Sequence, residues 1–238
     1  MSIEHCVIIG GSSGIGLATA KRLLSPTMKV TITGRSEDKL NNAWKSFGGT
    51  VGKAAFDATK PDAVRHFFDG LGPFDHLVLA ASGGKGLGPF ATLDLADIGG
   101  GVDEKIKPQL GCLQAALPTL NKAGSVTFIS AVSAQIAAPG IAGIGAINGM
   151  LLTVVPILAV ELKPLRVNVV APGVIDTPWW DFLSGEERQA VFAEYAGKTA
   201  VGRIGRAEDV ADAIAFLVSN GFMTGQVLTC DGCLRFAA

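Results

Sequence analysis

Short apolar runs rich in β-branched residues alternate with helix-length stretches along the whole chain. The runs that predict strands are 6–9, 30–33, 51–56, 76–80, 125–130, 167–170 and 226–229. The stretches that predict helices are 14–24, 36–47, 61–71, 97–120, 142–161, 178–195 and 207–219. No charge-rich or Pro/Ser-rich linker interrupts this order. The pattern therefore predicts a single α/β domain over residues 1–238, a doubly wound parallel sheet of about seven strands with helices on both faces.

A glycine-rich turn joins the first predicted strand directly to the first predicted helix. Glycines allow the backbone to approach a pyrophosphate, and the free N–H groups at a helix start stabilise its charge. An ordinary strand-to-helix turn is the alternative, but the flanking strand and helix favour a dinucleotide site of the Rossmann type. The predicted cofactor-binding residues of this turn are Gly10, Ser12, Ser13, Gly14, Ile15 and Gly16.

The end of the second predicted strand carries Arg35 and Ser36 and no acidic residue that would hold both ribose hydroxyls of NAD. A guanidinium makes charge-assisted hydrogen bonds to a 2′-phosphate, so the sequence favours NADP(H) over NAD(H). A solvated arginine at a helix start is the alternative. After the third strand, Asp57 and Ala58 are further cofactor-binding candidates, with Asp57 either accepting from the adenine amino group or capping a helix.

Composition and charge narrow the possible partners. Hydrophobic residues make up 48% of the chain and charged residues 17%, which is enough apolar material for a large core. The net charge of −1 provides no positive field for nucleic acid or for an anionic membrane. Cys230 and Cys233 form a C-x-x-C without the second pair or nearby histidines that a zinc site needs, so we expect no metal site.

The uncharged segment 123–160 exceeds the length of about 20 residues that a membrane span requires. Pro139, Gly140 and Pro156 divide it into a strand, a loop and a helix. A buried strand and a fully covered helix explain the segment better than a membrane span. No signal-like stretch precedes the first strand-like run, so we expect a cytoplasmic protein.

Two later motifs read RVNVVAPGVIDTP over 166–178 and TGQVLTCDG over 224–232. Together with the glycine turn, they resemble the short-chain dehydrogenase/reductase family over essentially the whole chain. The resemblance implies a homodimer or homotetramer that pairs the helices 97–120 and 142–161. It also implies further cofactor contacts from Ala81, Gly83, Pro172, Gly173, Val174, Ile175 and Thr177.

The family resemblance further implies a catalytic group of Asn, Ser, Tyr and Lys, with the tyrosine as acid/base. Aligned with this chain, those four positions fall, in that order, on Lys105, Ala131, Ile144 and Asn148. Ile144 has no proton to give, and the only tyrosine, Tyr195, lies outside that helix. The sequence 80–83 also departs from the usual Asn-Asn-Ala-Gly, which removes a structural hydrogen-bond bridge.

Lys105 and Asn148 suggest that an ammonium and an amide have exchanged places, so that Lys105 binds the nicotinamide ribose and Asn148 supports it. A solvated lysine within 103–107 is the alternative. Ser133 either replaces the lost serine in part or bonds to the local backbone. Trp179 and Trp180 either line an apolar substrate pocket or anchor its lid.

Two functions therefore remain open. One is an NADP(H)-binding protein that is catalytically impaired or non-catalytic. The other is an atypical NADP-dependent oxidoreductase, acting on a small carbonyl or alcohol, that uses Lys105, Ser133 or water as its proton source.

Overall fold

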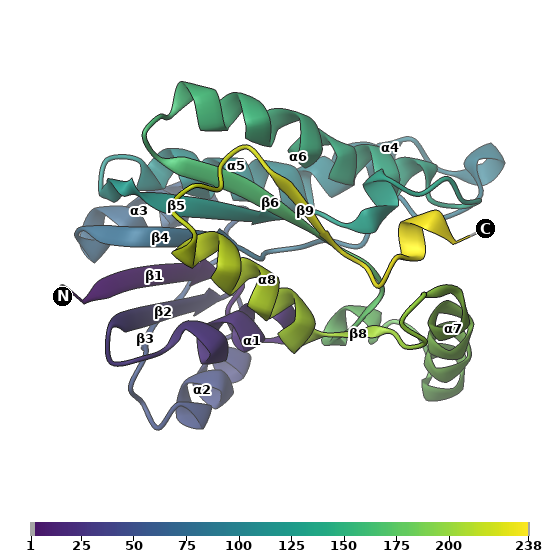
Figure 1. The fold of residues 1–238 in the computed structure, drawn as a ribbon, viewed down its shortest axis with the longest axis horizontal. Coiled ribbons are helices and arrows are strands. Elements are labelled where there is room, and N and C mark those ends of the chain that lie inside the picture. Colours follow the sequence, from purple (N-terminus) through teal and green to yellow (C-terminus); the bar gives the residue numbers. More distant parts are fainter. Residues whose placement is uncertain (1–2, 238) are drawn as a thin grey trace.

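The computed structural model describes residues 3–237, which form a seven-stranded parallel sheet covered by helices on both faces (Figure 1). The strand order is β3-β2-β1-β4-β5-β6-β9, and a separate two-stranded sheet joins β7 to β8. The strands are β1 (Glu4–Ile9), β2 (Met28–Gly34), β3 (Gly52–Ala55), β4 (Phe74–Leu79), β5 (Leu120–Ile129), β6 (Arg166–Pro172), β7 (Ile175–Asp176), β8 (Gly205–Arg206) and β9 (Val227–Cys230). The predicted doubly wound α/β fold is confirmed.

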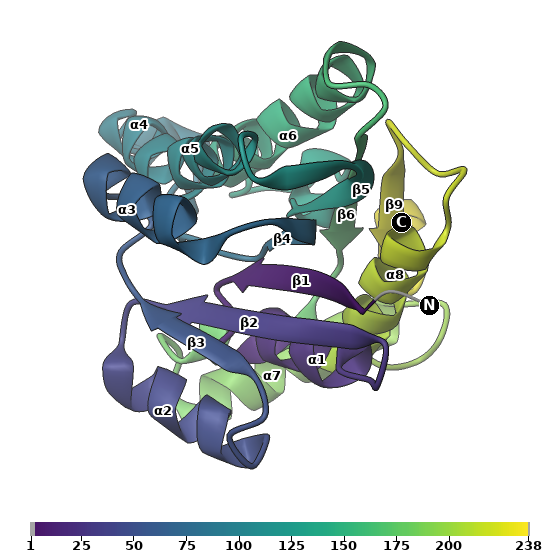
Figure 2. The same cartoon turned by 90° about the vertical axis from the view of Figure 1, so that its left-hand side faces the viewer.

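Helices α3, α5 and α6 cover one face of the sheet, and α1, α2 and α8 cover the other (Figure 2). The helices are α1 (Gly14–Leu23), α2 (Glu37–Ser46), α3 (Pro61–Leu71), α4 (Ala96–Gly101), α5 (Lys107–Ala116), α6 (Ala142–Glu161), α7 (Gly185–Lys198) and α8 (Ala207–Ser219). The chain winds from β1 outward to β3, then returns to β4 on the other side of β1. This reversal leaves a crevice at the carboxyl ends of β1 and β4, where ligands of such sheets bind.

The predicted helix 97–120 is wrong in two respects. It is interrupted after α4 by a π-helical turn, Val102–Ile106, and it ends at Ala116, so that Leu120 already belongs to β5. Pro108 supplies no N–H to the carbonyl four residues earlier, while the N–H of Lys107 bonds to the carbonyl of Val102, five residues back. The spacing of apolar residues continues unchanged through the π-helical turn. It therefore could not predict the change of helix type.

The predicted helix 178–195 is also wrong at its start. Pro178–Trp180 form a 3-10 turn, and α7 begins only after Ser184. Ser184 accepts from the N–H of Glu187 while the carboxylate of Glu187 accepts from the N–H of Ser184, a capping box that fixes this later start. The strands β7 and β8 have two residues each and carry no periodicity to recognise.

Helix α6 has two unlike faces. It is long and apolar enough to cross a membrane by length and composition, yet one third of its most apolar 18-residue stretch is buried within the chain. Ile147, Leu151 and Val155 pack on the sheet, whereas Ile157 and Val160 are exposed. The expectation of a fully covered helix is therefore wrong for the single chain, because no other element of the described chain lies on the outer face.

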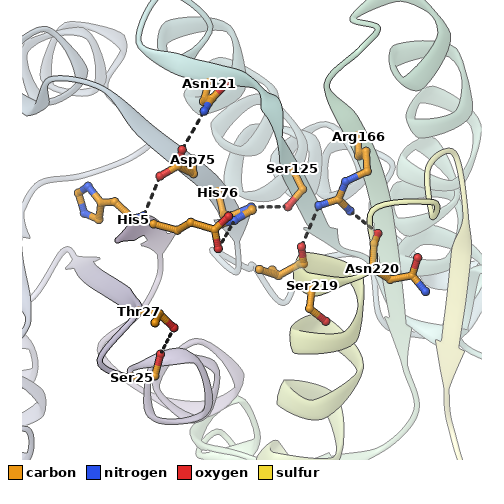
Figure 3. Close-up of polar contacts among 12 residues, drawn as sticks. His5, Ser25, Thr27, Asp75, His76, Asn121, Ser125, Arg166, Ser219 and Asn220 are labelled. Atoms are coloured by element: carbon orange, nitrogen blue, oxygen red, sulfur yellow. Dashed lines mark hydrogen bonds and ion pairs between the residues drawn. The ribbon is translucent and has the colours of Figure 1, made fainter. Parts of the chain in front are cut away.

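A polar cluster ties together the amino ends of the strands, at the edge opposite to the crevice (Figure 3). The Nδ1 atom of His76 lies 2.8 Å from the hydroxyl of Ser125, and its Nε2 atom lies 3.7 Å from the carboxylate of Glu4. Arg166, at the start of β6, donates to three carbonyls at the end of α8. Burial lowers the pKa of His76, and the nearby Glu4 opposes this shift.

We expect the free energy of unfolding to decrease as the pH falls below about 6.5. The unfolded chain takes up a proton at His76 that the folded chain resists, because burial lowers the pKa of His76 in the folded state. Urea unfolding of the parent, of His76→Gln and of the exposed control His66→Gln, from about pH 5 to about pH 8, measures this slope. An undiminished slope in His76→Gln would show that His76 does not cause it.

Candidate active site

The turn between β1 and α1 packs backbone directly against backbone. A Cβ at Gly16 would lie 2.2 Å from the carbonyl oxygen of Gly10, and one at Gly10 would lie 2.9 Å from the backbone of Ala80 and Ala81. Gly10 also has a φ of +85°, which favours glycine. Ser13 is the N-cap of α1, and its side chain makes no capping bond. The start of α1 therefore stands beside the carboxyl end of β4, with its N–H groups available to an anion.

The predicted 2′-phosphate and adenine contacts meet at the carboxyl ends of β2 and β3. Arg35 is exposed, and Ser36 caps α2 by accepting from the N–H of Lys39. Asp57 accepts from the N–H and the hydroxyl of Thr59, so it shapes a turn and does not cap a helix. The Thr59 N–H lowers the pKa of Asp57 most, and the charge of Arg35 adds to this effect. The guanidinium and the carboxylate thus lie near each other.

The chain after β6 returns to the glycine turn. Pro172 ends β6 and Ile175 begins β7, two residues before Thr177. A Cβ at Gly14 would lie 3.4 Å from the side chain of Thr177, so the two segments are neighbours. The fold thus brings the predicted phosphate-side residues and the predicted nicotinamide-side residue Thr177 to the same edge of the sheet.

The π-helical turn places Lys105 in the protein interior. The residue is 6% exposed, and its Nζ atom donates to Asn148 Oδ1 at 2.6 Å and to the carbonyl oxygen of Ser130 at 3.2 Å. Burial lowers the pKa of Lys105 to about 7. The solvated-lysine alternative is therefore wrong. The ammonium and the amide are in direct contact, while the role of the pair toward a cofactor stays a prediction.

Asn148 also makes a hydrogen bond to Ser133. Because Asn148 Oδ1 accepts from Lys105, its Nδ2 atom donates to the hydroxyl oxygen of Ser133 at 2.9 Å. Within residues 3–237, Ser133 makes no hydrogen bond to the local backbone through its hydroxyl, so the competing interpretation of that serine is wrong. Its hydroxyl proton is free to be donated, and the side chain is only half buried.

The remaining two family positions cannot exchange a proton. Ala131 and Ile144 are both partly exposed, and Ile144 lies one turn before Asn148 on α6. Tyr195 belongs to α7, where Lys198 Nζ lies 5.2 Å from its ring. Helices α7 and α6 lie on opposite sides of the sheet (Figure 2). No phenol therefore stands at the position from which the family's tyrosine acts.

Comparison with known proteins gives the same assignment. The family model described as Enoyl-(Acyl carrier protein) reductase matches residues 10–234. Glucose 1-dehydrogenase from Gluconobacter oxydans is 32% identical to this chain, over 96% of this chain and 91% of that protein. The chain belongs to the short-chain dehydrogenase/reductase family.

Two solved structures of short-chain dehydrogenase/reductases are similar to this one. A small-chain dehydrogenase in complex with NADPH has a TM-score of 0.85 and 26% identity, covering 98% of this chain and 99% of that one. A short-chain oxidoreductase from Pseudomonas aeruginosa PAO1, described as containing an atypical catalytic center, has a TM-score of 0.88 and 25% identity, with both chains fully covered.

Gln109 is a site residue of this short-chain dehydrogenase/reductase that sequence reasoning missed. It is fully buried on α5, and its Nε2 atom donates to the carbonyls of Ala81 at 3.0 Å and of Ile129 at 3.2 Å. These bonds join the carboxyl ends of β4 and β5. Gln109 thus supplies a bridge where the altered sequence 80–83 suggested that one was lost. A lone glutamine in an apolar helix belongs to no motif, so no signal indicated it.

Proposed function

We propose that this short-chain dehydrogenase/reductase binds NADP(H) and that its carbonyl chemistry is impaired relative to members with a catalytic tyrosine. One observation carries the second part of the proposal. Ile144 stands where the phenol would act, and the chain's single tyrosine is on α7. A positioned acid/base contributes about a hundred- to ten-thousand-fold to such reactions, so its loss lowers the rate by a comparable factor.

The residues of the crevice fit the cofactor. Gly10 and Gly16 pack so closely on neighbouring backbone that a Cβ would not fit, and this tight turn brings the N–H groups at the start of α1 to the crevice, which suits a pyrophosphate. Arg35 is exposed at the end of β2, where a 2′-phosphate would need a cation. The related structure that holds NADPH supports the same assignment. When bound, NADP(H) supplies or accepts the hydride.

The hydrogen-bonded side chains of buried Lys105 and Asn148 and of half-buried Ser133 are the polar groups that remain at the site. We assign Lys105 to the ribose hydroxyls of the nicotinamide half, with Asn148 holding the amine in place. Ser133 points a donor hydroxyl toward the substrate oxygen, since its own oxygen already accepts from Asn148. The surrounding Ala131 and Ile144 add only apolar surface.

A second candidate function is an atypical oxidoreductase with a substitute proton donor. The observation that favours it is the buried amine of Lys105, which is hydrogen-bonded to Asn148 and through Asn148 connected to the hydroxyl of Ser133. Burial lowers the pKa of this amine to about 7, which suits a group that gives and takes protons near neutral pH. In this version the proton comes from Lys105, from Ser133 or from water, and turnover persists at a reduced rate.

We also propose that the chain forms a homodimer or homotetramer through α5 and α6. The support is the exposed apolar side of α6, where Met150, Ile157 and Val160 have little cover. Light scattering on the parent and on Ile157→Glu tests this proposal. A parent that is a monomer at micromolar concentration would contradict it.

The test of the main proposal combines calorimetric titration with NADPH and NADH and assays of NADPH oxidation over a panel of carbonyl compounds. NADPH binding with slow or absent turnover supports the impaired protein. Turnover that disappears in Lys105→Ala, with NADPH still bound, supports the atypical oxidoreductase. Rapid carbonyl reduction by the parent would contradict the impairment, and absence of NADPH binding would contradict both functions.

Replacing Arg35 tests the cofactor preference separately. In Arg35→Ala we expect NADPH affinity to fall about tenfold or more, because a charge-assisted bond to the 2′-phosphate contributes about 1.5–3 kcal/mol. NADH affinity is expected to stay within about twofold, since NADH has no 2′-phosphate. Calorimetry with both nucleotides measures this difference. Equal losses for the two would show that Arg35 acts on the fold and not on the phosphate.

A further inference from the structure

Trp179 connects two walls of the crevice that are far apart in sequence. It belongs to the 3-10 turn after β7, and its indole Nε1 atom donates to the carbonyl oxygen of Gly83, 96 residues earlier, at 3.1 Å. A Cβ at Gly84 would lie 3.8 Å from the same nitrogen, so the indole is also close to Gly84. The residue therefore joins the segment after β7 to the loop after β4.

Both of the joined segments also contact the glycine turn. Gly10 packs against the backbone of Ala80 and Ala81, just before Gly83, and Gly14 packs against Thr177, two residues before Trp179. The glycine turn, the loop after β4 and the segment after β7 thus contact one another in pairs at the carboxyl edge of the sheet, where the proposed cofactor site lies. Trp179 makes the contact between the loop after β4 and the segment after β7.

The segment that carries Trp179 is held firmly on its own side. Arg188, on α7, donates to Asp176 at 2.6 Å, to Asp181 at 3.0 Å and to the carbonyl of Thr177 at 3.1 Å. Trp180 Nε1 donates to the carbonyl of Ile175 at 3.0 Å. This bond lies within the segment after β6 and connects it to no other part of the chain. The two adjacent tryptophans therefore have different roles.

The partner loop is anchored on the side of α6, where the N–H of Ile144 donates to the carbonyl of Gly86 at 2.8 Å and the N–H of Gly88 donates to the carbonyl of Gly140 at 2.9 Å. Gly83, nearer to β4, is the residue that faces Trp179. Besides Trp179, only the hydroxyl of Ser82, at 3.3 Å, donates to the Gly83 carbonyl within residues 3–237. Gly84 and Gly86 follow, and glycine gives this stretch more backbone freedom than other residues would. The indole bond is thus the specific connection that holds a glycine-rich loop to an anchored segment.

We propose that Trp179 is a strap across the nucleotide crevice, whose bond to the Gly83 carbonyl opens each time NADP(H) enters or leaves. The inference rests on the proposed NADP(H) binding. The bond is present in this structure, and in this proposal it forms again once the nucleotide has entered. Weakening it therefore speeds entry and release together and leaves the affinity nearly unchanged.

Trp179→Phe tests the strap, because it keeps an aromatic ring and removes the N–H donor. The matched control is Trp180→Phe, which removes the same donor from the bond to Ile175 within the segment. Stopped-flow measurement of NADPH emission gives the association and dissociation rate constants. For Trp179→Phe we expect both to rise about two- to tenfold, as one neutral hydrogen bond allows, with Kd changed less than twofold. For Trp180→Phe we expect both to stay within twofold.

Hydrogen exchange without nucleotide provides an independent reading. Amides of residues 82–86 are expected to exchange faster in Trp179→Phe and to be unchanged in Trp180→Phe. Unchanged rate constants in Trp179→Phe, or a weaker Kd with an unchanged association rate constant, would overturn the strap while the proposed function stands. A parent that does not bind NADPH would overturn both.

Discussion

Ile144→Tyr is expected to raise the rate of NADPH-dependent carbonyl reduction by about a hundred- to ten-thousand-fold. The substitution supplies a phenol one helical turn before Asn148, where the family's acid/base stands. Lys105 already holds an amine in contact with Asn148, and positive charge close to a phenol favours its proton transfer. Assays of NADPH oxidation over a carbonyl panel, with parent and variant side by side, measure the gain.

Ile144→Phe is the matched control, because it adds the ring without the hydroxyl. A gain that appears equally in Ile144→Phe would arise from substrate packing and not from proton transfer. Lys105→Met combined with Ile144→Tyr closes a double-mutant cycle that measures how far the amine assists the phenol. An inactive Ile144→Tyr that still binds NADPH would show that the site lacks more than the phenol.

The order of strands and helices was accessible from the sequence because parallel sheets covered on both faces produce near-continuous apolar strands. Val7, Ile8 and Ile9 are all buried, as this pattern requires. The boundaries failed where one local interaction decides the outcome. Pro108 changes the helix type without changing the apolar period, and the Ser184 capping box delays α7. Such details depend on individual hydrogen bonds, which periodicity does not encode.

The candidate site was predictable to the extent that family spacing locates it. That spacing indicated Lys105 and Asn148 as a pair, and their side chains are in contact. It gave no sign of Gln109, whose amide joins β4 to β5, or of the bond from Trp179 to Gly83. These contacts join segments that come together only in the folded chain, so no local sequence pattern carries them.

Lys105→Met is expected to weaken NADPH binding by about ten- to a hundredfold. In the proposed site the amine donates to the ribose hydroxyls, and a hydrogen bond to a charged group contributes about 1.5–3 kcal/mol. Methionine keeps much of the volume and leaves Asn148 without its partner. Lys107→Met is the control, since Lys107 is two residues away, exposed, and paired with Asp103 on the surface. Calorimetric titration with NADPH compares the two variants.

The pH dependence of the affinity separates a charged contact from a purely structural one. Burial lowers the pKa of Lys105 to about 7 in the free chain, and ribose oxygens that accept from the ammonium raise it in the complex. The contribution of Lys105 to NADPH affinity is therefore constant below about pH 7 and declines above it, by up to about tenfold for each pH unit, until the pKa of the complex is passed. Lys105→Met is expected to lose this decline and Lys107→Met to keep it. If Lys105→Met weakens binding equally at every pH and the parent shows no decline, Lys105 supports the fold of the site and does not contact the nucleotide as an ammonium.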